Sequence, residues 1–357
     1  MNKFYSILVP LLIFTFCHSY ADDKAAKKKE PCGCGKVSKA SALISAPKIA
    51  QIGMVEIPSG SFMMGNNDPA AKPDESPVHQ VKIDAFYMDE TEVTNEQFQK
   101  FVKETSYVTT AEKPVDWELL KQQIPPNTPK PSADKLAPGS LVFKQTKHPV
   151  SLNDYSQWWH WINGADWRHP HGPKSKILGN DHPVVHVSFE DAQAYCKWQG
   201  KRLPTEAERE WAAKGGLENN KYPWGNEEVD VTKPQANIWE GEFPHKSNKI
   251  DWTTPVKKYP PNGYGLYDMA GNVWEWTSDL YDAHYYVTLD KQGSVVNPHN
   301  TEKSFDPDDP NVKKYVIRGG SFMCHNSYCW GYRISARMKT SPDSSMINLG
   351  FRCVKDK

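Results

Sequence analysis

Residues 261–276 read PNGYGLYDMAGNVWEW and combine the features that decide the expected fold. The glycines permit sharp turns, and the aromatic side chains between them are large enough to anchor irregular backbone in a core. Asp268, Glu275 and the carbonyl groups between them could wrap a hard cation such as Ca²⁺. A tight turn with a half-buried acid that accepts backbone hydrogen bonds is an equally good interpretation of the same residues.

The whole chain shares this composition. It has 357 residues, with 38% hydrophobic and 12% aromatic residues, 13 Trp and 28 Pro, which favours a loop-rich globule over a helical bundle. Lys+Arg and Asp+Glu balance at 43 each, so no overall field indicates a nucleic-acid partner. No nucleophile elbow, phosphate-binding loop or dinucleotide fingerprint occurs, which excludes several large enzyme classes.

Few regular elements are expected. Residues 54–57 alternate like a strand. Three helices are predicted from capping boxes and glycine stops, over residues 94–105, 188–200 and 205–215. Residues 125–149 and 282–311 look like surface insertions. The fold class predicted is therefore α+β, a single irregular domain over residues 51–357.

The N-terminus predicts export. Lys3 precedes an apolar run over residues 7–16, and small residues around Ala21 suit signal-peptidase cleavage, so residues 1–21 are predicted to be a signal peptide. A lipid anchor on Cys17 is the alternative, but bulky Phe16 precedes it. No other segment approaches the ~18 apolar residues of a membrane span.

Residues 22–50 are rich in Lys, Ala and Ser and predict a flexible arm. The arm contains Cys32 and Cys34, which lie too close in sequence to bridge each other without strain. Intermolecular pairing or thiol exchange is one interpretation of these two cysteines, and a dispensable tail is the other.

The strongest chemical signal is the stretch GGSFMCHNSYC at residues 319–329. Cys324 and Cys329 lie five residues apart, so a bend must bring their sulfurs to the same side of the chain. Two soft thiolates favour Cu(I), whereas zinc would need four ligands and only His325 is near. A short-loop disulfide is the alternative, since six cysteines remain after the signal peptide and an oxidising compartment favours pairing.

Two further clusters could bind metal. Loop residues Asn237, Ile238, Asn248 and Ile250 could supply an all-oxygen calcium site. The histidines within residues 167–171 have no cysteine or acid at ligand spacing, so surface hydrogen bonding is expected for them instead.

Together these clusters resemble the formylglycine-generating enzyme family, also called sulfatase-modifying factors. The resemblance covers about residues 52–355, through the segments 54–65, 83–93, 167–173, 182–216, 222–226, 237–244, 260–279 and 318–353. RLPTEAE, GNVWEW, RGGSF and NLGFR mark only the wider superfamily, which has non-oxidase members. The pair Cys324 and Cys329, followed by residues 341–345 and Asn348, resembles the true enzyme.

The resemblance implies a C-type-lectin-like fold and a specific site. Cys324 and Cys329 would bind Cu(I) as the redox-active pair, and four residues would line the pocket: Ser321, Trp274, Tyr328 and Asn348. Two structural Ca²⁺ ions are implied, one at Asn237, Ile238, Asn248 and Ile250, the other at Asp268, Gly271, Val273 and Glu275. Cys196 and Cys353 would form a structural disulfide. A second disulfide of the vertebrate members would fall at Ala213 and Ile334, so both of its cysteines are absent together.

The implied activity is conversion of the cysteine of a Cys-x-Pro-x-Arg motif in an unfolded sulfatase to Cα-formylglycine, with O₂ and a thiol reductant. A monomer, exported to the periplasm, the medium or a secretory lumen, is expected. One alternative is a non-catalytic sulfatase-binding or lectin-like module of the same fold. Another is an iron-dependent oxidase of the superfamily, but the chain lacks the extra helical region that its iron site needs.

Overall fold

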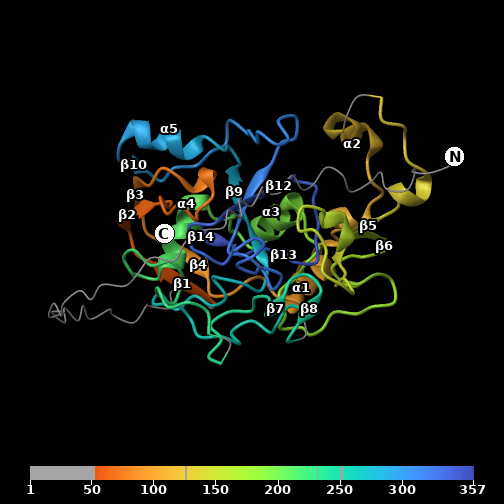
Figure 1. Ribbon diagram of the computed structural model, residues 1–357, viewed down its shortest axis with the longest axis horizontal. Coiled ribbons are helices and arrows are strands. Elements are labelled where there is room, and N and C mark those ends of the chain that lie inside the picture. The colour runs from red at the N-terminus through yellow and green to blue at the C-terminus, as the bar shows by residue number, and fades with distance from the viewer. Residues whose placement is uncertain (1–52, 125–126, 231, 250–251) are drawn as a thin grey trace.

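A computed structural model describes residues 53–124, 127–230, 232–249 and 252–357 (Figure 1). The predicted signal peptide, the arm with Cys32 and Cys34, and Ile250 lie outside these residues. Within them, no helix has both the length and the apolar character needed to cross a membrane.

Helices are few and short. The α-helices of the described chain are α1 (Asn95–Thr105), α2 (Trp117–Gln123), α3 (Phe189–Trp198), α4 (Glu206–Lys214) and α5 (Tyr285–Gln292). Short 3₁₀ helices occur at η1 (Pro73–Glu75), η2 (Thr110–Glu112), η3 (Ala133–Leu136) and η4 (Tyr155–Gln157). The strands are β1 (Met54–Ile57), β2 (Gly60–Met64), β3 (His79–Ile83), β4 (Phe86–Asp89), β5 (Gly139–Phe143), β6 (Trp159–Asn163), β7 (Gly241–Glu242), β8 (Lys246–Ser247), β9 (Trp274–Leu280), β10 (Val295–Val296), β11 (Tyr315–Arg318), β12 (Arg337–Thr340), β13 (Leu349–Gly350) and β14 (Val354–Asp356).

The three helices predicted from capping boxes are confirmed. Thr94, Ser188 and Thr205 each accept a hydrogen bond from the N–H three residues later, and the side chain at that position bonds back to the cap. Helix α4 ends at Gly215 in the left-handed conformation, as the glycine stop predicted. Local chemistry was therefore sufficient to locate these helix starts.

The central sheet has the strand order β12-β11-β9-β13. Strand β9 begins inside the GNVWEW motif, pairs antiparallel with β11 and parallel with β13, and so is covered on both edges. Smaller sheets, β1-β4-β14 and β10-β3-β2, and the pairs β5-β6 and β7-β8 surround it. The predicted irregular, loop-rich α+β domain is confirmed.

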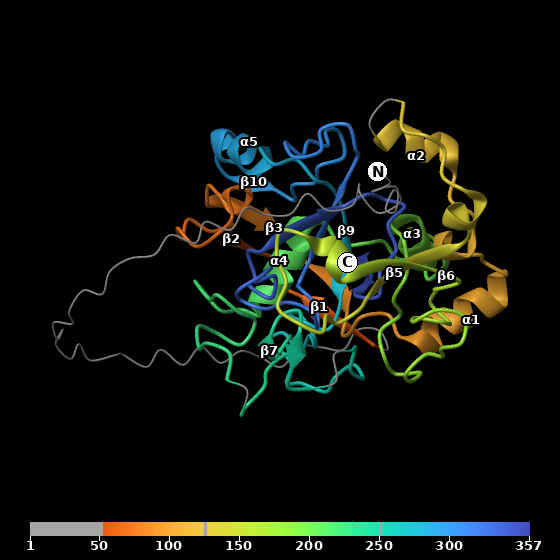
Figure 2. The ribbon, with the colours of Figure 1, turned by 45° about the vertical axis from the view of Figure 1, so that its right-hand side comes forward.

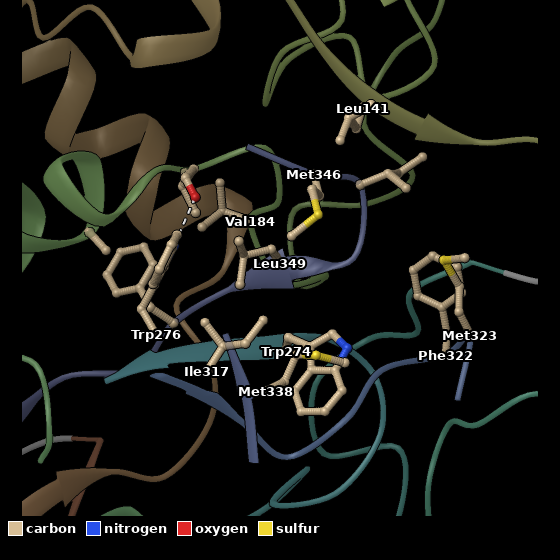
Figure 3. Close-up of a cluster of buried hydrophobic side chains, with 14 of the residues drawn as sticks. Leu141, Val184, Trp274, Trp276, Ile317, Phe322, Met323, Met338, Met346 and Leu349 are labelled. Atoms are coloured by element: carbon tan, nitrogen blue, oxygen red, sulfur yellow. Dashed lines mark hydrogen bonds between the residues drawn. The ribbon is translucent and has the colours of Figure 1, made fainter. Parts of the chain in front are cut away.

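Two apolar clusters form the core. The larger contains Trp274 and Trp276 of β9, and Figure 3 shows them beside Ile317 and Met338 of the neighbouring strands, with Leu349 and Met346 close by. The smaller packs β1 to β4 against α4 and contains Ala213 and Ile334. Ala213 and Ile334 are the two positions at which the second disulfide of the vertebrate members would fall. Both are apolar and packed in this cluster, so no unpaired thiol is left there.

The prediction that residues 125–149 and 282–311 are surface insertions is wrong in part. All five residues of β5 are buried, and α5 buries Tyr286 and Leu289. Strand β5 is covered on both faces, so its sequence, GSLVF, lacks the polar alternation by which a half-exposed strand is recognised. In contrast, α2 buries no residue and lies at the edge of the molecule in both ribbon views (Figures 1 and 2).

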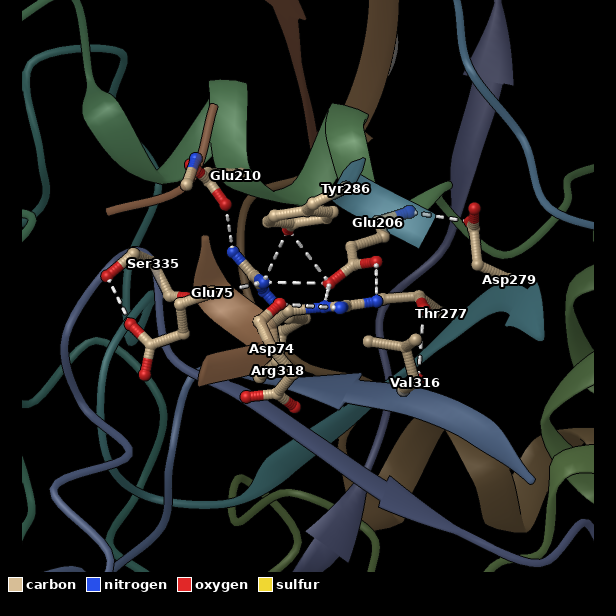
Figure 4. Close-up of polar contacts among 12 residues, drawn as sticks. Asp74, Glu75, Glu206, Glu210, Thr277, Asp279, Tyr286, Val316, Arg318 and Ser335 are labelled. Atoms are coloured by element: carbon tan, nitrogen blue, oxygen red, sulfur yellow. Dashed lines mark hydrogen bonds and ion pairs between the residues drawn. The ribbon is translucent and has the colours of Figure 1, made fainter. Parts of the chain in front are cut away.

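A buried ion-pair network joins α4 to the central sheet (Figure 4). The Glu206 carboxylate accepts hydrogen bonds from Arg318 Nη1 at 2.8 Å and from Arg337 Nε at 2.7 Å. Arg318 also pairs with Glu210. All four side chains are almost completely buried, so removing one charge would leave a partner unpaired in the core.

Candidate active site

The loop that carries the cysteine pair leaves β11 at Arg318 and turns through Gly319 and Gly320, whose φ angles are +94° and +75°. A Cβ atom on Gly320 would lie 2.7 Å from the backbone of Gly331, so the turn needs glycine there. The turn brings Cys324 and Cys329 together with their Cα atoms 5.5 Å apart, and the structure joins them as a disulfide. The predicted bend is therefore present, and the oxidised pair corresponds to the short-loop alternative.

A small cavity of about 30 Å³ lies against this pair, with room for about two water-sized molecules. All six pocket residues named from the resemblance line it: Trp274, Ser321, Cys324, Tyr328, Cys329 and Asn348. Five other lining residues were missed: Trp159, Ile317, Met323, Met338 and Met346. They are apolar residues from separate segments, and in the sequence they look like ordinary core positions.

Two polar side chains organise the cavity wall. The Ser321 N–H donates to Cys324 Sγ at 3.4 Å, and Asn348 Nδ2 donates to Ser321 Oγ at 3.0 Å. Asn348 Oδ1 is buried without a hydrogen-bond partner. Because an unpaired buried acceptor is costly, this oxygen could accept a hydrogen bond from a molecule in the cavity.

Two aromatic side chains pack against Tyr328, which lines the pocket. The Tyr328 ring stacks on Phe243 with the centroids 4.6 Å apart, and the edge of Trp158 packs against Tyr328 at 5.5 Å. Rings in these arrangements attract one another beyond their burial. Tyr328 is therefore held by Phe243 of the β7-β8 hairpin and by Trp158, the residue before β6. Both lie far from Tyr328 in sequence.

Behind the cavity, His186 connects three segments, and sequence reasoning missed it. Its ring Nδ1 lies 2.7 Å from Ser140 Oγ of β5, and its ring Nε2 lies 2.9 Å from the Pro170 carbonyl. Its backbone N–H donates to the Met346 carbonyl. Complete burial lowers the pKa of His186 to about 3. The neutral ring therefore donates from Nε2 and accepts from Ser140, which itself bonds to Ser345 beside the cavity wall.

The two predicted calcium sites meet at Asn237. The Asn272 N–H donates to the Asn237 carbonyl at 2.7 Å, and Asn237 pairs with Gly271 in an isolated bridge. Asn237 Oδ1 is buried without a hydrogen-bond partner, so this oxygen is available to a cation. Asn248 lies just past the β7-β8 hairpin, where its N–H donates to the Glu240 carbonyl.

At the second predicted calcium site, the Glu275 carboxylate already has arginine partners. Both oxygens of the Glu275 carboxylate accept hydrogen bonds from Arg209 and Arg352, whose side chains are buried. Glu92, which sequence reasoning did not select, lies near Asp268, and burial together with that carboxylate raises the pKa of Glu92 well above its usual value. Among the described residues no three His, Cys, Asp or Glu side chains form a metal-binding group, so calcium here would depend on carbonyl and amide oxygens.

A second disulfide lies away from the cavity. Cys196 of α3 and Cys353, next to β14, are paired with their Cα atoms 5.7 Å apart and 157 residues apart in sequence. The pairing implied by the resemblance is confirmed. Both sulfurs are fully buried in the larger core cluster.

Comparisons with known proteins agree with this arrangement. Residues 40–357 match the family described as the sulfatase-modifying factor enzyme 1-like domain. The chain is 42% identical over 361 residues to a formylglycine-generating enzyme of Mus musculus, covering 94% of this chain and 89% of that protein. It is also 42% identical over 307 residues to a formylglycine-generating enzyme of Mycobacterium tuberculosis, covering 85% of this chain and 97% of that protein.

Two other similarities concern an inactive relative and a solved structure. The chain is 38% identical over 309 residues to an inactive C-alpha-formylglycine-generating enzyme 2 of Bos taurus, covering 85% of this chain and 87% of that protein. The solved structure of PvdO from Pseudomonas aeruginosa matches with a TM-score of 0.57 and 24% identity, covering 85% of this chain and 94% of that one, which supports the fold alone. From the matched residues and the curated relatives, the chain belongs to the sulfatase-modifying factor enzyme family.

Proposed function

We propose that this chain oxidises a cysteine side chain in an unfolded sulfatase to Cα-formylglycine. The observation that carries the proposal is the pair Cys324 and Cys329 at the wall of a small cavity that also presents Ser321 and Asn348. A binding module without catalysis would have no use for two adjacent sulfurs beside a buried unpaired acceptor. An inactive relative shows that the fold alone is not sufficient, so the proposal depends on this pair.

Copper(I) fits the residues present. The cavity offers two cysteine sulfurs, with the thioethers of Met338 and Met346 also in its wall, and soft sulfur ligands select Cu(I). In the described part of the chain no third His, Cys, Asp or Glu joins the pair, so a tetrahedral zinc site is not favoured. Copper, when bound by reduced Cys324 and Cys329, would supply the reactivity toward O₂ that the side chains lack.

The protein's own residues would hold and shield the reacting groups. The Ser321 backbone N–H donates to Cys324 Sγ and so fixes the position of that sulfur. Asn348 holds the Ser321 hydroxyl in place and offers its free oxygen to a donor in the cavity. The apolar side chains around them, Ile317 and Trp274 among them, exclude water.

The proposed reaction balances with O₂ and an external thiol. One substrate thiol, one O₂ and two molecules of external thiol give the aldehyde, hydrogen sulfide, one external disulfide and water. A carbon–hydrogen bond and the carbon–sulfur bond of the substrate cysteine break, and O₂ is reduced by substrate and thiol together. We further propose that the substrate segment has the form Cys-x-Pro-x-Arg and binds in an extended conformation.

The test uses the full mature chain loaded with Cu(I), a Cys-x-Pro-x-Arg peptide, O₂ and a thiol reductant. Mass spectrometry should detect conversion of the peptide cysteine to an aldehyde, which a hydrazine probe then captures. A peptide with Ser in place of Cys is the control for the probe. Absence of aldehyde with loaded protein would favour the non-catalytic sulfatase-binding alternative.

We propose that the mature chain acts outside the cytosol after removal of residues 1–21. N-terminal sequencing of the protein from its native host should then begin at Asp22. A mature chain that begins at Met1 or at a lipid-modified Cys17 would contradict this.

A further inference from the structure

Gly331 lies two residues after Cys329, and a side chain there would enter the cavity wall. A Cβ atom on Gly331 would lie 2.5 Å from Trp274 Cζ2, closer still to Cη2, and 3.0 Å from Cys324 Sγ. Real Cβ atoms do not tolerate the first two contacts. The backbone at Gly331 is not in the left-handed region, so its need for glycine is steric and not conformational.

The backbone at this point cannot easily move away from the cavity. The preceding residue, Trp330, has a φ of +41°, which bulky residues rarely adopt. Its ring centroid lies 4.3 Å from Lys221 Nζ and 4.8 Å from Arg333 Cζ. Arg333 is itself fixed by two hydrogen bonds of 2.6 Å to the buried Glu75 carboxylate. The loop after Cys329 is therefore tied to Lys221 and, through Arg333, to the buried Glu75.

Because the loop is held, a methyl group at position 331 would have to displace what faces it. Those neighbours are the Trp274 indole and the Cys324 sulfur, which both line the cavity. The cavity has space for only about two water-sized molecules, so a small movement of either group would change it appreciably.

We propose that Gly331 is a positioning residue for the cysteine pair: its missing side chain is what lets the Trp274 indole and Cys324 Sγ share one wall of the cavity at their present separation. The inference rests on the proposed function for its effect on turnover. Its effect on the cysteine pair itself can be measured without turnover.

The main measurement is the equilibrium between dithiol and disulfide for Cys324 and Cys329, titrated against a dithiothreitol buffer and read by thiol alkylation and mass spectrometry. In the disulfide the Cys324 sulfur is held against position 331, whereas in the dithiol it can rotate away. Gly331→Ala should therefore shift this equilibrium toward the dithiol by tenfold or more, which is about 30 mV for a two-electron couple. With the Cys-x-Pro-x-Arg peptide, kcat should fall at least tenfold while KM changes less than twofold, because the remote peptide contacts are untouched.

Gly60 provides a matched control. A Cβ atom there would lie 2.6 Å and 2.8 Å from two indole carbons of Trp211, a similar collision in the smaller core cluster, away from the cysteines. Gly60→Ala should lower the melting temperature by several degrees, as Gly331→Ala should, since each adds a methyl group where an indole ring already packs. It should leave the dithiol equilibrium and kcat within twofold of wild type.

A double variant tests whether Gly331 acts through Trp274. Trp274→Phe removes the indole carbons nearest position 331, so adding Gly331→Ala to it should have a smaller effect on the dithiol equilibrium than in wild type. If Gly331→Ala keeps the wild-type equilibrium and kcat and only melts earlier, as Gly60→Ala does, the proposal is overturned. If wild type itself makes no aldehyde, the proposed function fails and the thiol titration alone decides the inference.

Discussion

The two disulfides of the described chain are both buried in the larger core cluster, but they differ in the length of the loop that each closes and in what lies beside them. Cys196–Cys353 joins α3 to the C-terminal segment across 157 residues, and neither cysteine lines the cavity. Cys324–Cys329 closes a loop of five residues and borders a cavity with polar groups in its wall. In the chain-entropy model, closing the long loop stabilises the fold by about 5 kcal/mol and closing the short loop by about 2 kcal/mol. The first pair therefore contributes more to the stability of the fold, and the second lies where the proposed chemistry requires it.

The largest effect should follow from breaking the pair at the cavity. Cys324→Ser and Cys329→Ser should each lower turnover of the Cys-x-Pro-x-Arg peptide by about 10⁴-fold or more, since each removes one of two groups that act as a unit. Thermal unfolding should change less than in a variant of the other disulfide, because the short closed loop contributes only about 2 kcal/mol. A serine variant that retained turnover within tenfold would remove the cysteine pair from the mechanism.

Breaking the other pair should give the reverse result. Cys196→Ser should lower the free energy of unfolding by up to about 4–5 kcal/mol, from the long loop that the bond closes. Urea unfolding measures this, with Cys324→Ser as the control, which opens only the short loop and should lose about 2 kcal/mol. Turnover at a temperature where the variant is still folded should remain near the wild-type value, and a large loss there would contradict the division of roles.

Calcium bound at Asn237 and around Asp268 should raise the free energy of unfolding, as the Cys196–Cys353 disulfide does. Chelation should lower the free energy of unfolding by about 3 kcal/mol for an ion that had been present at 100 times its dissociation constant. Calorimetry with and without a calcium chelator measures this, and added Mg²⁺ serves as the control ion. Identical unfolding curves in both conditions would argue against either calcium site.

The smallest effect should be a pH dependence that originates at His186. Its folded-state pKa of about 3 lies below the unfolded value, so the unfolded chain binds the proton and stability is lost as pH falls below about 6.5. Between pH 6.5 and 5 this amounts to about 1.6 kcal/mol. Urea unfolding of wild type and His186→Gln at both pH values should show a smaller change in the variant, and Cys196→Ser should keep the wild-type change. Equal pH changes in His186→Gln and wild type would show that this histidine is not the source.

Sequence reasoning succeeded where the signal is local. The capping boxes at Thr94, Ser188 and Thr205 gave three helix starts, because a cap satisfies N–H groups only three residues away. It failed for β5 and α5, where burial by distant segments outweighs weak local preference. The pairing of Glu206 with Arg318 and Arg337 was also missed, because charged residues 112 and 131 positions apart carry no periodic signal.

The sequence alone determined the cysteine motif, the helix caps and the family to which the chain is similar, because these depend on residue type and short spacing. Only the tertiary structure decided that Trp274, Asn348 and Met346 meet the cysteines at one cavity, that His186 supports its wall, and that Gly331 must lack a side chain. Those relations depend on the packing of segments that are distant in the chain. There, a difference of a few tenths of an ångström in an interatomic distance decides between a van der Waals contact and a clash.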